Sequence, residues 1–301
     1  MASLSDDRLR KLKDSISKTG FPLELEIGEI LASRNYYTSP NIHYLDDETG
    51  KDRELDNFAL FPAAKSHEFD PDPVRFSPHI AVECKRLGDV SVAVFARNRL
   101  VVTTFDFSGQ MYDFPRLILH KPPPVDLTRE FDLGWTISRS ELHYNEFAPR
   151  IGIAKGIKPG SEPLGEDEEK KKDPVYSGVM QLVKAQIHDV RSAIARDKEI
   201  AYSYYPFYFS FLVLVVEGAL VEVKGKGASL DLRQVDHAVA RTSFKASYDD
   251  NFQGYLIDVV TKDHFSRFLD VLESDVGKLA SALEKQKDRL SEYMRRPSNV
   301  F

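Results

Sequence analysis

Hydrophobic residues recur at helical spacing in four segments of the chain. The first segment follows Ser5, a residue type that favours helix N-termini, and the second has Pro22 in its first turn. A long helix is predicted at about residues 175–195 and a C-terminal helix at about 263–294. The apolar positions that define the four helices are Leu9, Leu12 and Ile16; Leu23, Ile27, Ile30 and Leu31; Met180, Val183, Ile187, Val190 and Ile194; and Phe265, Phe268, Leu269, Leu272, Val276, Leu279 and Leu283.

Short runs rich in apolar residues separate these helices and are typical of strands. Three runs follow the second helix and two more continue the series, whereas residues 115–150 show no consistent period. The pattern predicts an α/β protein with a mixed central β-sheet flanked by helices. The predicted strands cover residues 41–45, 53–61, 80–85, 91–96, 99–107, 207–216, 219–224 and 255–260.

Residues 155–174, KGIKPGSEPLGEDEEKKKDP, combine Pro and Gly with a dense run of charges. This composition predicts a mobile loop or linker. It divides the chain into an N-terminal part, 1–154, and a C-terminal part, 175–301. We expect the second part to complete the same domain with its helix, strands and C-terminal helix.

The most apolar run, FYFSFLVLVV at 207–216, is about half the roughly 20 residues that a membrane helix requires. It is therefore predicted to be a buried strand, and no membrane association is expected. The single cysteine, Cys84, excludes an internal disulfide, and the charged, amphipathic N-terminal stretch does not resemble a secretory signal. These features favour a cytoplasmic protein.

The composition permits a large core, since 42% of the 301 residues are hydrophobic and 29% are charged. The formal net charge is −6. A nucleic-acid partner would therefore be bound by a local basic surface or through metal ions, because the average field of the protein repels phosphates.

The stretch IAVECKR, residues 80–86, places a carboxylate and an ammonium two residues apart inside an apolar run. In a strand, Glu83 and Lys85 point to one face and Ile80, Val82 and Cys84 to the other, so we expect one core face and one charged face. Burying an ionised group costs several kcal/mol unless it is paired or bound to an ion. Two interpretations follow: a structural ion pair at the strand end, or a metal site with Glu83 as ligand.

A Glu-x-Lys pattern alone is weak evidence, since Glu222 and Lys224 repeat it on another predicted strand. The first pair differs because Asp56 lies on the preceding strand and can approach Glu83 across the sheet. Glu24, on the helix before these strands, could add a third carboxylate. Such an oxygen-rich group suits Mg²⁺ or Mn²⁺.

The order of these residues resembles the PD-(D/E)XK nuclease superfamily, which includes restriction endonuclease-like proteins. Glu24 stands in TGFPLELEIGEIL, Asp56 in GKDRELDNFAL and Glu83-Cys84-Lys85 in IAVECKR, and the match covers about residues 15–100. The Pro that gives the family its name is replaced by Leu55, a replacement that the superfamily tolerates. The resemblance implies a restriction endonuclease-like core with an elaborated C-terminal half.

The resemblance also implies a role for each residue. Asp56 and Glu83 would bind Mg²⁺ or Mn²⁺ together with the backbone carbonyl of Cys84, and Lys85 would orient or activate the attacking water. Glu24 would assist. Some family members place a helical Gln beside the metal, which makes Gln181 on the long helix a further candidate.

The function expected from this resemblance is metal-dependent hydrolysis of phosphodiester bonds, with DNA as the favoured nucleic-acid substrate. One alternative is a catalytically inactive member that binds nucleic acid or protein within a defence or repair complex. Another is a scaffold that forms a homodimer through the helix at 263–294.

Three other groups of residues have weaker signals of function. His143 with Glu146, and Asp236 with His237, could form acid-base pairs, although isolated histidines are more often structural. The aromatic cluster YSYYPFYF at 202–209 could stack on bases, but packing in a buried strand is the more common role of such residues.

Overall fold

The computed structural model describes residues 5–46, 48–62, 74–96, 111–113, 142–146, 150–160, 173–197, 205–227, 229–245 and 252–295. The helices are α1 (Asp6–Ile16), α2 (Phe21–Ser33), α7 (His143–Glu146), α9 (Pro174–Asp197) and α10 (Phe265–Arg295), the last preceded by a 3-10 turn, Lys262–His264. The strands are β1 (Tyr37–Asp46), β2 (Lys51–Leu60), β3 (Val74–Arg86), β4 (Ser91–Ala96), β5 (Met111–Asp113), β6 (Ile151–Ile157), β7 (Tyr205–Glu217), β8 (Leu220–Lys226), β9 (Ser229–Gln234), β10 (His237–Lys245) and β11 (Phe252–Thr261).

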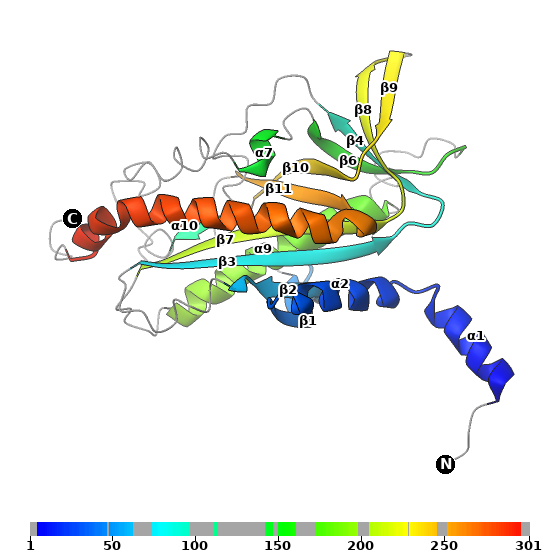
Figure 1. Cartoon of the computed structure of the whole chain (residues 1–301), viewed down its shortest axis with the longest axis horizontal. Helices are drawn as coiled ribbons and strands as arrows, with labels where there is room; N and C mark the ends of the chain where they lie inside the picture. The colour runs from blue at the N-terminus through cyan, green and yellow to red at the C-terminus, as the bar shows by residue number, and fades with distance from the viewer. Residues whose placement is uncertain are drawn as a thin grey trace.

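The strands of the described residues form one mixed sheet in the order β1-β2-β3-β7-β11-β10-β6-β4-β8-β9, and β5 pairs with β7 (Figure 1). The first three strands are antiparallel neighbours, whereas β7 runs parallel to β3 over its whole length. Parallel neighbours require a crossover connection, and α9, which precedes β7, packs against both β3 and β7. The predicted α/β architecture with a mixed sheet flanked by helices is confirmed.

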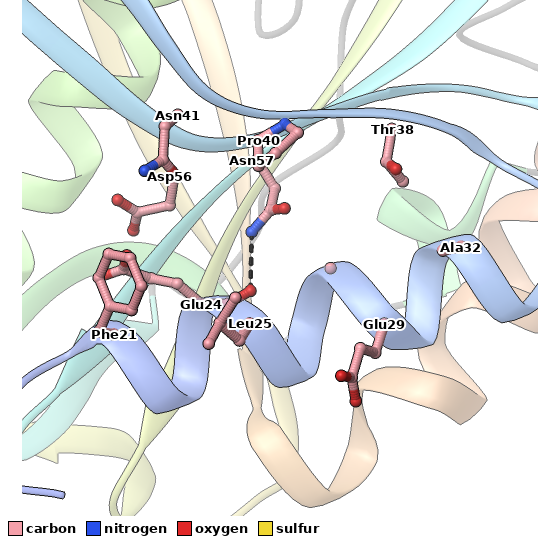
Figure 2. A pocket seen from close by; sticks show the side chains of 11 residues that line it. Phe21, Glu24, Leu25, Glu29, Ala32, Thr38, Pro40, Asn41, Asp56 and Asn57 are labelled. Carbon is pink, nitrogen blue, oxygen red and sulfur yellow. Dashed lines mark hydrogen bonds between the residues drawn. The ribbon is translucent and has the colours of Figure 1, made fainter. Parts of the chain in front are cut away.

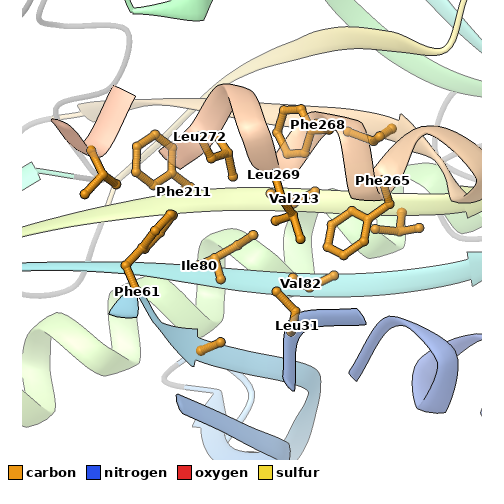
Figure 3. Packing of buried hydrophobic residues seen from close by; sticks show 14 of the residues in the cluster. Leu31, Phe61, Ile80, Val82, Phe211, Val213, Phe265, Phe268, Leu269 and Leu272 are labelled. Atoms are coloured by element: carbon orange, nitrogen blue, oxygen red, sulfur yellow. The ribbon is translucent and has the colours of Figure 1, made fainter. Parts of the chain in front are cut away.

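Helices cover both faces of the sheet. On one face, α2 and α10 pack against β3, β7 and β11; Figure 3 shows Phe265, Phe268 and Leu272 of α10 lying over Val213 and Phe211 of β7. On the other face, the apolar side of α9 packs against a second set of buried side chains from β2, β3, β7 and β11. This second set includes Leu55, Ala81, Leu212, Leu214, Val216, Ile257 and Val259.

β3 has the expected division into an apolar face and a face that carries Glu83 and Lys85, but the second face is covered as well. Val82 and Cys84 pack on the face covered by α2 and α10, but Ala81 and Glu83 are also buried, on the face covered by α9. A central strand that is covered by helices on both faces exposes neither. Glu83 is therefore inside a layered core, whereas Lys85 is partly exposed.

The apolar run at 207–216 forms the centre of β7, and its described side chains from Phe209 to Val216 are buried. The prediction of a buried strand is confirmed. None of the described helices is long and apolar enough to cross a membrane. The apolar stripe of α10, proposed from the sequence as a dimerisation surface, packs on the chain's own sheet from Phe265 to Leu283.

Several elements differ from the predicted bounds. The pattern missed β5, β6, β9 and β10; β9 is exposed at all its positions and shows no buried alternation that could mark it. β6 extends to Ile157, three residues into the predicted linker, and α9 begins at Pro174, while 161–172 and the predicted strand at 99–107 lie outside the described residues. At the N-terminus, Ser5 is the N-cap of α1 without a side-chain capping bond, and α1 buries no residue.

Candidate metal centre

The contact between β2 and β3 ends at the pair Asn57–Val82, and Asp56 and Glu83 are the next residues on the two strands. Here a side chain replaces the backbone partner, since Oδ2 of Asp56 accepts a hydrogen bond from the N–H of Cys84 at 2.6 Å. The N–H and C=O of one strand residue point to the same neighbouring strand. The carbonyl of Cys84 therefore also faces β2, on the side of Asp56.

Glu83 and Lys85 lie on the face covered by α9. The ammonium of Lys85 donates to Oε1 of Glu83, which is fully buried, and to Oε1 of Gln181 at 3.2 Å. Gln181 is held in turn, because its Nε2 donates to the backbone carbonyl of Glu54 at 3.5 Å and its backbone carbonyl accepts from the hydroxyl of Tyr44 at 3.1 Å. The predicted Gln181 is thus in contact with the predicted Lys85.

Glu24 approaches the same end of β2 from α2. It lines a cavity of about 210 Å³ between α2, β1 and β2, together with Asp56 and Asn57, and Figure 2 shows Glu24 and Asp56 at one end of this cavity. The buried amide of Asn57 donates to the backbone carbonyl of Glu24 at 3.1 Å. This bond fixes the first turn of α2 against β2.

Burial raises the pKa values of all three carboxyl groups, and repulsion by nearby acids adds to the rise. Burial raises the pKa of Glu83 to about 8, because attraction by Lys85 offsets it only in part and Asp56 and Glu24 add to the rise. Burial likewise raises the pKa of Asp56, opposed by the N–H of Cys84 and by Lys85. The pKa of Glu24 is raised by burial and then by Asp56 and Glu54. Negative charge is thus in excess at this site.

The residues present fit a hard divalent cation. Oε2 of Glu83 is buried and has no hydrogen-bond partner among the described residues, so one strong acceptor is left over. Carboxylate and carbonyl oxygens are the ligands that Mg²⁺ and Mn²⁺ prefer. Asp56, Glu83 and the carbonyl of Cys84 could hold such an ion, with Glu24 beside them.

The structure brings together every residue that the sequence analysis assigned to this site. Glu24 comes from α2 and Gln181 from α9, on opposite faces of the sheet, and both reach the end of the β2–β3 contact. Sequence reasoning missed Asn57, although a lone amide in an apolar strand next to Asp56 is a visible signal. It also missed Gly178, where an added Cβ would lie 3.3 Å from Cε of Lys85 and 2.7 Å from Cδ1 of Leu214.

The second Glu-x-Lys pair has no such surroundings. Glu222 and Lys224 lie on β8, with their charged atoms 3.2 Å apart. Across β9 the residue opposite Glu222 is Arg233, and across β4 it is Val94. Glu222 is buried and ion-paired like Glu83, but no carboxylate is paired with it in either neighbouring strand, so this pair lacks the second acid of the first site.

A separate buried cluster contains the two histidines that the sequence analysis considered. His143 and His237 both contact Asp258, whereas the side chain of Glu146 lies outside the described residues. Burial disfavours a charge on His143, but Asp258 and Asp275 outweigh burial and raise its pKa to about 9. The pKa of His237 is lowered, mainly by burial. Asp258 and Asp275 come from distant elements and carry no local sequence signal.

Comparison of the chain with known protein families, curated proteins and solved structures found no match.

Proposed function

We propose that this protein is a Mg²⁺- or Mn²⁺-dependent nuclease with a restriction endonuclease-like core, and that it hydrolyses phosphodiester bonds, with DNA as the favoured substrate. The observation that carries the proposal is the convergence of Asp56, Glu83 and Lys85 where β2 and β3 separate. These are the residues that the resemblance to PD-(D/E)XK nucleases assigns to metal binding and to activation of water.

The arrangement of the elements supports the same proposal. The acid-bearing α2 precedes three antiparallel strands, and α9 carries Gln181 to Lys85 before the chain enters β7 beside β3. The two carboxylates lie on adjacent strands, as a shared metal requires. The sheet beyond β7 would be the elaborated C-terminal half.

The proposed ion would be held by Asp56, Glu83 and the carbonyl of Cys84, with Glu24 assisting. When bound, it would neutralise negative charge at the phosphate that is cleaved. Glu83 also holds the ammonium of Lys85, and it has a second carboxylate oxygen left for the ion. Oε1 of Glu83 thus positions Lys85, and Oε2 would bind the cation.

Lys85 would orient the attacking water or a phosphate oxygen. Its ammonium has three N–H donors, and two of them point to Glu83 and Gln181. The third donor remains for substrate or water. Because Gln181 and Glu83 fix the directions of two N–H bonds, the protein also fixes the direction of the third N–H bond before the substrate arrives.

The test is a cleavage assay on supercoiled plasmid, linear duplex, single-stranded DNA and RNA in Mg²⁺, Mn²⁺ or EDTA. The variants are Glu83→Gln and Lys85→Ala, with Glu222→Gln and Lys224→Ala as the matched control pair of equal spacing on β8. We expect cleavage that requires the metal, is abolished in both site variants and persists in both control variants.

Cleavage that survives in Lys85→Ala and Glu83→Gln, or that is lost equally in the β8 variants, would contradict this assignment. Metal-dependent binding of nucleic acid without any cleavage would instead favour the inactive binding subunit. If the protein binds neither nucleic acid nor Mn²⁺, both the nuclease and the inactive binding subunit are excluded.

A further inference from the structure

Four buried polar residues meet on the α10 face of the sheet, away from the carboxylate centre. His143 comes from the short α7, His237 from the start of β10, Asp258 from β11 and Asp275 from α10. In the sheet β7 separates β11 from β3, so this cluster is not part of the Asp56–Glu83 site. All four residues are at most 3% exposed.

The donor atoms of three of these residues converge. Nε2 of His143 and Nε2 of His237 each lie 2.7 Å from the same oxygen of Asp258, Oδ1. One ligand atom from each residue lies within 4.8 Å of the others. Two imidazole nitrogens and a carboxylate oxygen, arranged around one point, are a common donor set for Zn²⁺.

Asp258 provides an independent sign of a missing partner. Its second oxygen, Oδ2, is buried and has no hydrogen-bond partner within the described part of the chain. A buried carboxylate oxygen without a partner carries a large desolvation cost. A cation held by the two histidines would offset that cost if Asp258 binds it through Oδ2.

Asp275 completes the arrangement from behind His143. Its Oδ2 lies 2.6 Å from Nδ1 of His143 and also accepts the backbone N–H of His143 at 3.0 Å, while Oδ1 accepts from Lys278 at 3.2 Å. A metal ion would displace the proton from Nε2 of His143, and the carboxylate on Nδ1 would keep the other proton there, so that Nε2 becomes the metal-binding nitrogen. Metal-ligating histidines characteristically have such a partner.

We propose that His143, His237 and Asp258 bind one Zn²⁺ ion, or a transition-metal ion of similar preference, with Asp275 as the positioning residue for His143. The bound ion would join α7, β10 and β11, and through Asp275 also α10. Because the ligands are buried, the role of this site is to stabilise the fold, and it is independent of the proposed nuclease activity.

The test measures metal bound to the full chain by plasma mass spectrometry, after exposure to Zn²⁺ and dialysis. His237→Gln and Asp258→Asn remove ligands. His43→Gln is the matched control, since His43 and Asp52 form a histidine–carboxylate pair 3.0 Å apart on the surface, and Glu83→Gln controls for the carboxylate centre. We expect about one equivalent of Zn²⁺ in the wild type and both controls, and at least a tenfold lower content in the two ligand variants.

A second measurement keeps the proposal testable if the ligand variants do not fold. X-ray absorption of the Zn²⁺-loaded wild type should show a shell of nitrogen and oxygen atoms with imidazole scattering, and removal of the ion should lower the melting temperature. Failure of the wild type to retain Zn²⁺, or equal retention by folded His237→Gln and Asp258→Asn, would overturn the proposal and leave a buried ionic network only.

Discussion

The carboxylate of Asp56 accepts the backbone N–H of Cys84 at 2.6 Å, at the position where the pairing of β2 and β3 ends. One side chain thus satisfies a main-chain donor and stands beside Glu83. Strand pairing and the proposed metal centre therefore depend on the same residue, and substitutions can separate the two roles.

Asp56→Asn retains an oxygen that can accept from Cys84 but removes the charge. We expect the free energy of unfolding to change by less than about 1 kcal/mol, while Mn²⁺ affinity falls at least about 100-fold. Asp56→Ala should instead lose a further 1–3 kcal/mol or so, because the N–H of Cys84 loses its acceptor. Urea unfolding and calorimetric titration with Mn²⁺ measure the two effects. Equal Mn²⁺ affinity in wild type and Asp56→Asn would exclude Asp56 as a ligand.

Gly178→Ala should disturb Lys85 without removing any charged group. An added Cβ would lie 2.7 Å from Cδ1 of Leu214 and 3.3 Å from Cε of Lys85, so the lysine stem must shift. We expect turnover to fall by about tenfold with little change in Mn²⁺ affinity, because positioning of the ammonium is lost while the carboxylates stay.

Gly277→Ala is the control for that substitution, because a Cβ at this position in α10 meets no atom within 4 Å. Both variants gain the helix propensity of Ala, about 0.5–1 kcal/mol. Gly277→Ala should therefore be more stable than wild type and fully active. If Gly178→Ala behaves in the same way in the cleavage assay, close packing of α9 on Lys85 has no role in turnover.

The stability of the metal-free protein should fall as pH rises through the titration of Glu83. Its pKa is about 8 in the folded chain against an ordinary value of 4.5, so the folded state binds the proton more tightly. The resulting stabilisation is complete below pH 4.5 and is lost as pH rises to about 8, at no more than about 1.4 kcal/mol per pH unit.

Glu83→Gln should remove this contribution, since glutamine carries no titrating proton. The free energy of unfolding of both proteins can be measured by urea unfolding in EDTA at pH 5, 6, 7 and 8. As pH rises, Glu83→Gln should become increasingly more stable relative to wild type. A difference independent of pH would mean that Glu83 ionises normally in the folded chain. Added Mn²⁺ should restore wild-type stability at pH 8 and leave Glu83→Gln unchanged.

Asn57 is expected to act through Glu24. Its amide is 2% exposed and donates to the carbonyl of Glu24 at 3.1 Å, so Asn57→Ala should cost about 1–3 kcal/mol of stability. Mn²⁺ affinity should fall less than in Asp56→Asn, because all carboxylates remain. Thr38→Ala, at another position in the same cavity, is the control and should keep wild-type affinity. If Asn57→Ala is as stable as wild type, the hydrogen bond from Asn57 to Glu24 does not fix α2.

Local patterns were sufficient where a residue's neighbours in sequence share its environment. The apolar period of α9 and α10 and the unbroken run in β7 mark elements that are buried along one stripe or on both faces. β9 escaped detection because it is exposed throughout, and the sequence could not show that α9 covers the charged face of β3.

The chain's sequence by itself determined the α/β class, the buried strand at 207–216 and the identity of the acids and lysine in the candidate centre. Only the tertiary structure decided that Glu24 and Gln181 reach these residues from opposite faces of the sheet. It also decided that His143, His237, Asp258 and Asp275 share one buried cluster. The physical reason is that hydrophobic periodicity reports which face of an element is buried, whereas contacts between distant elements depend on strand order and helix packing.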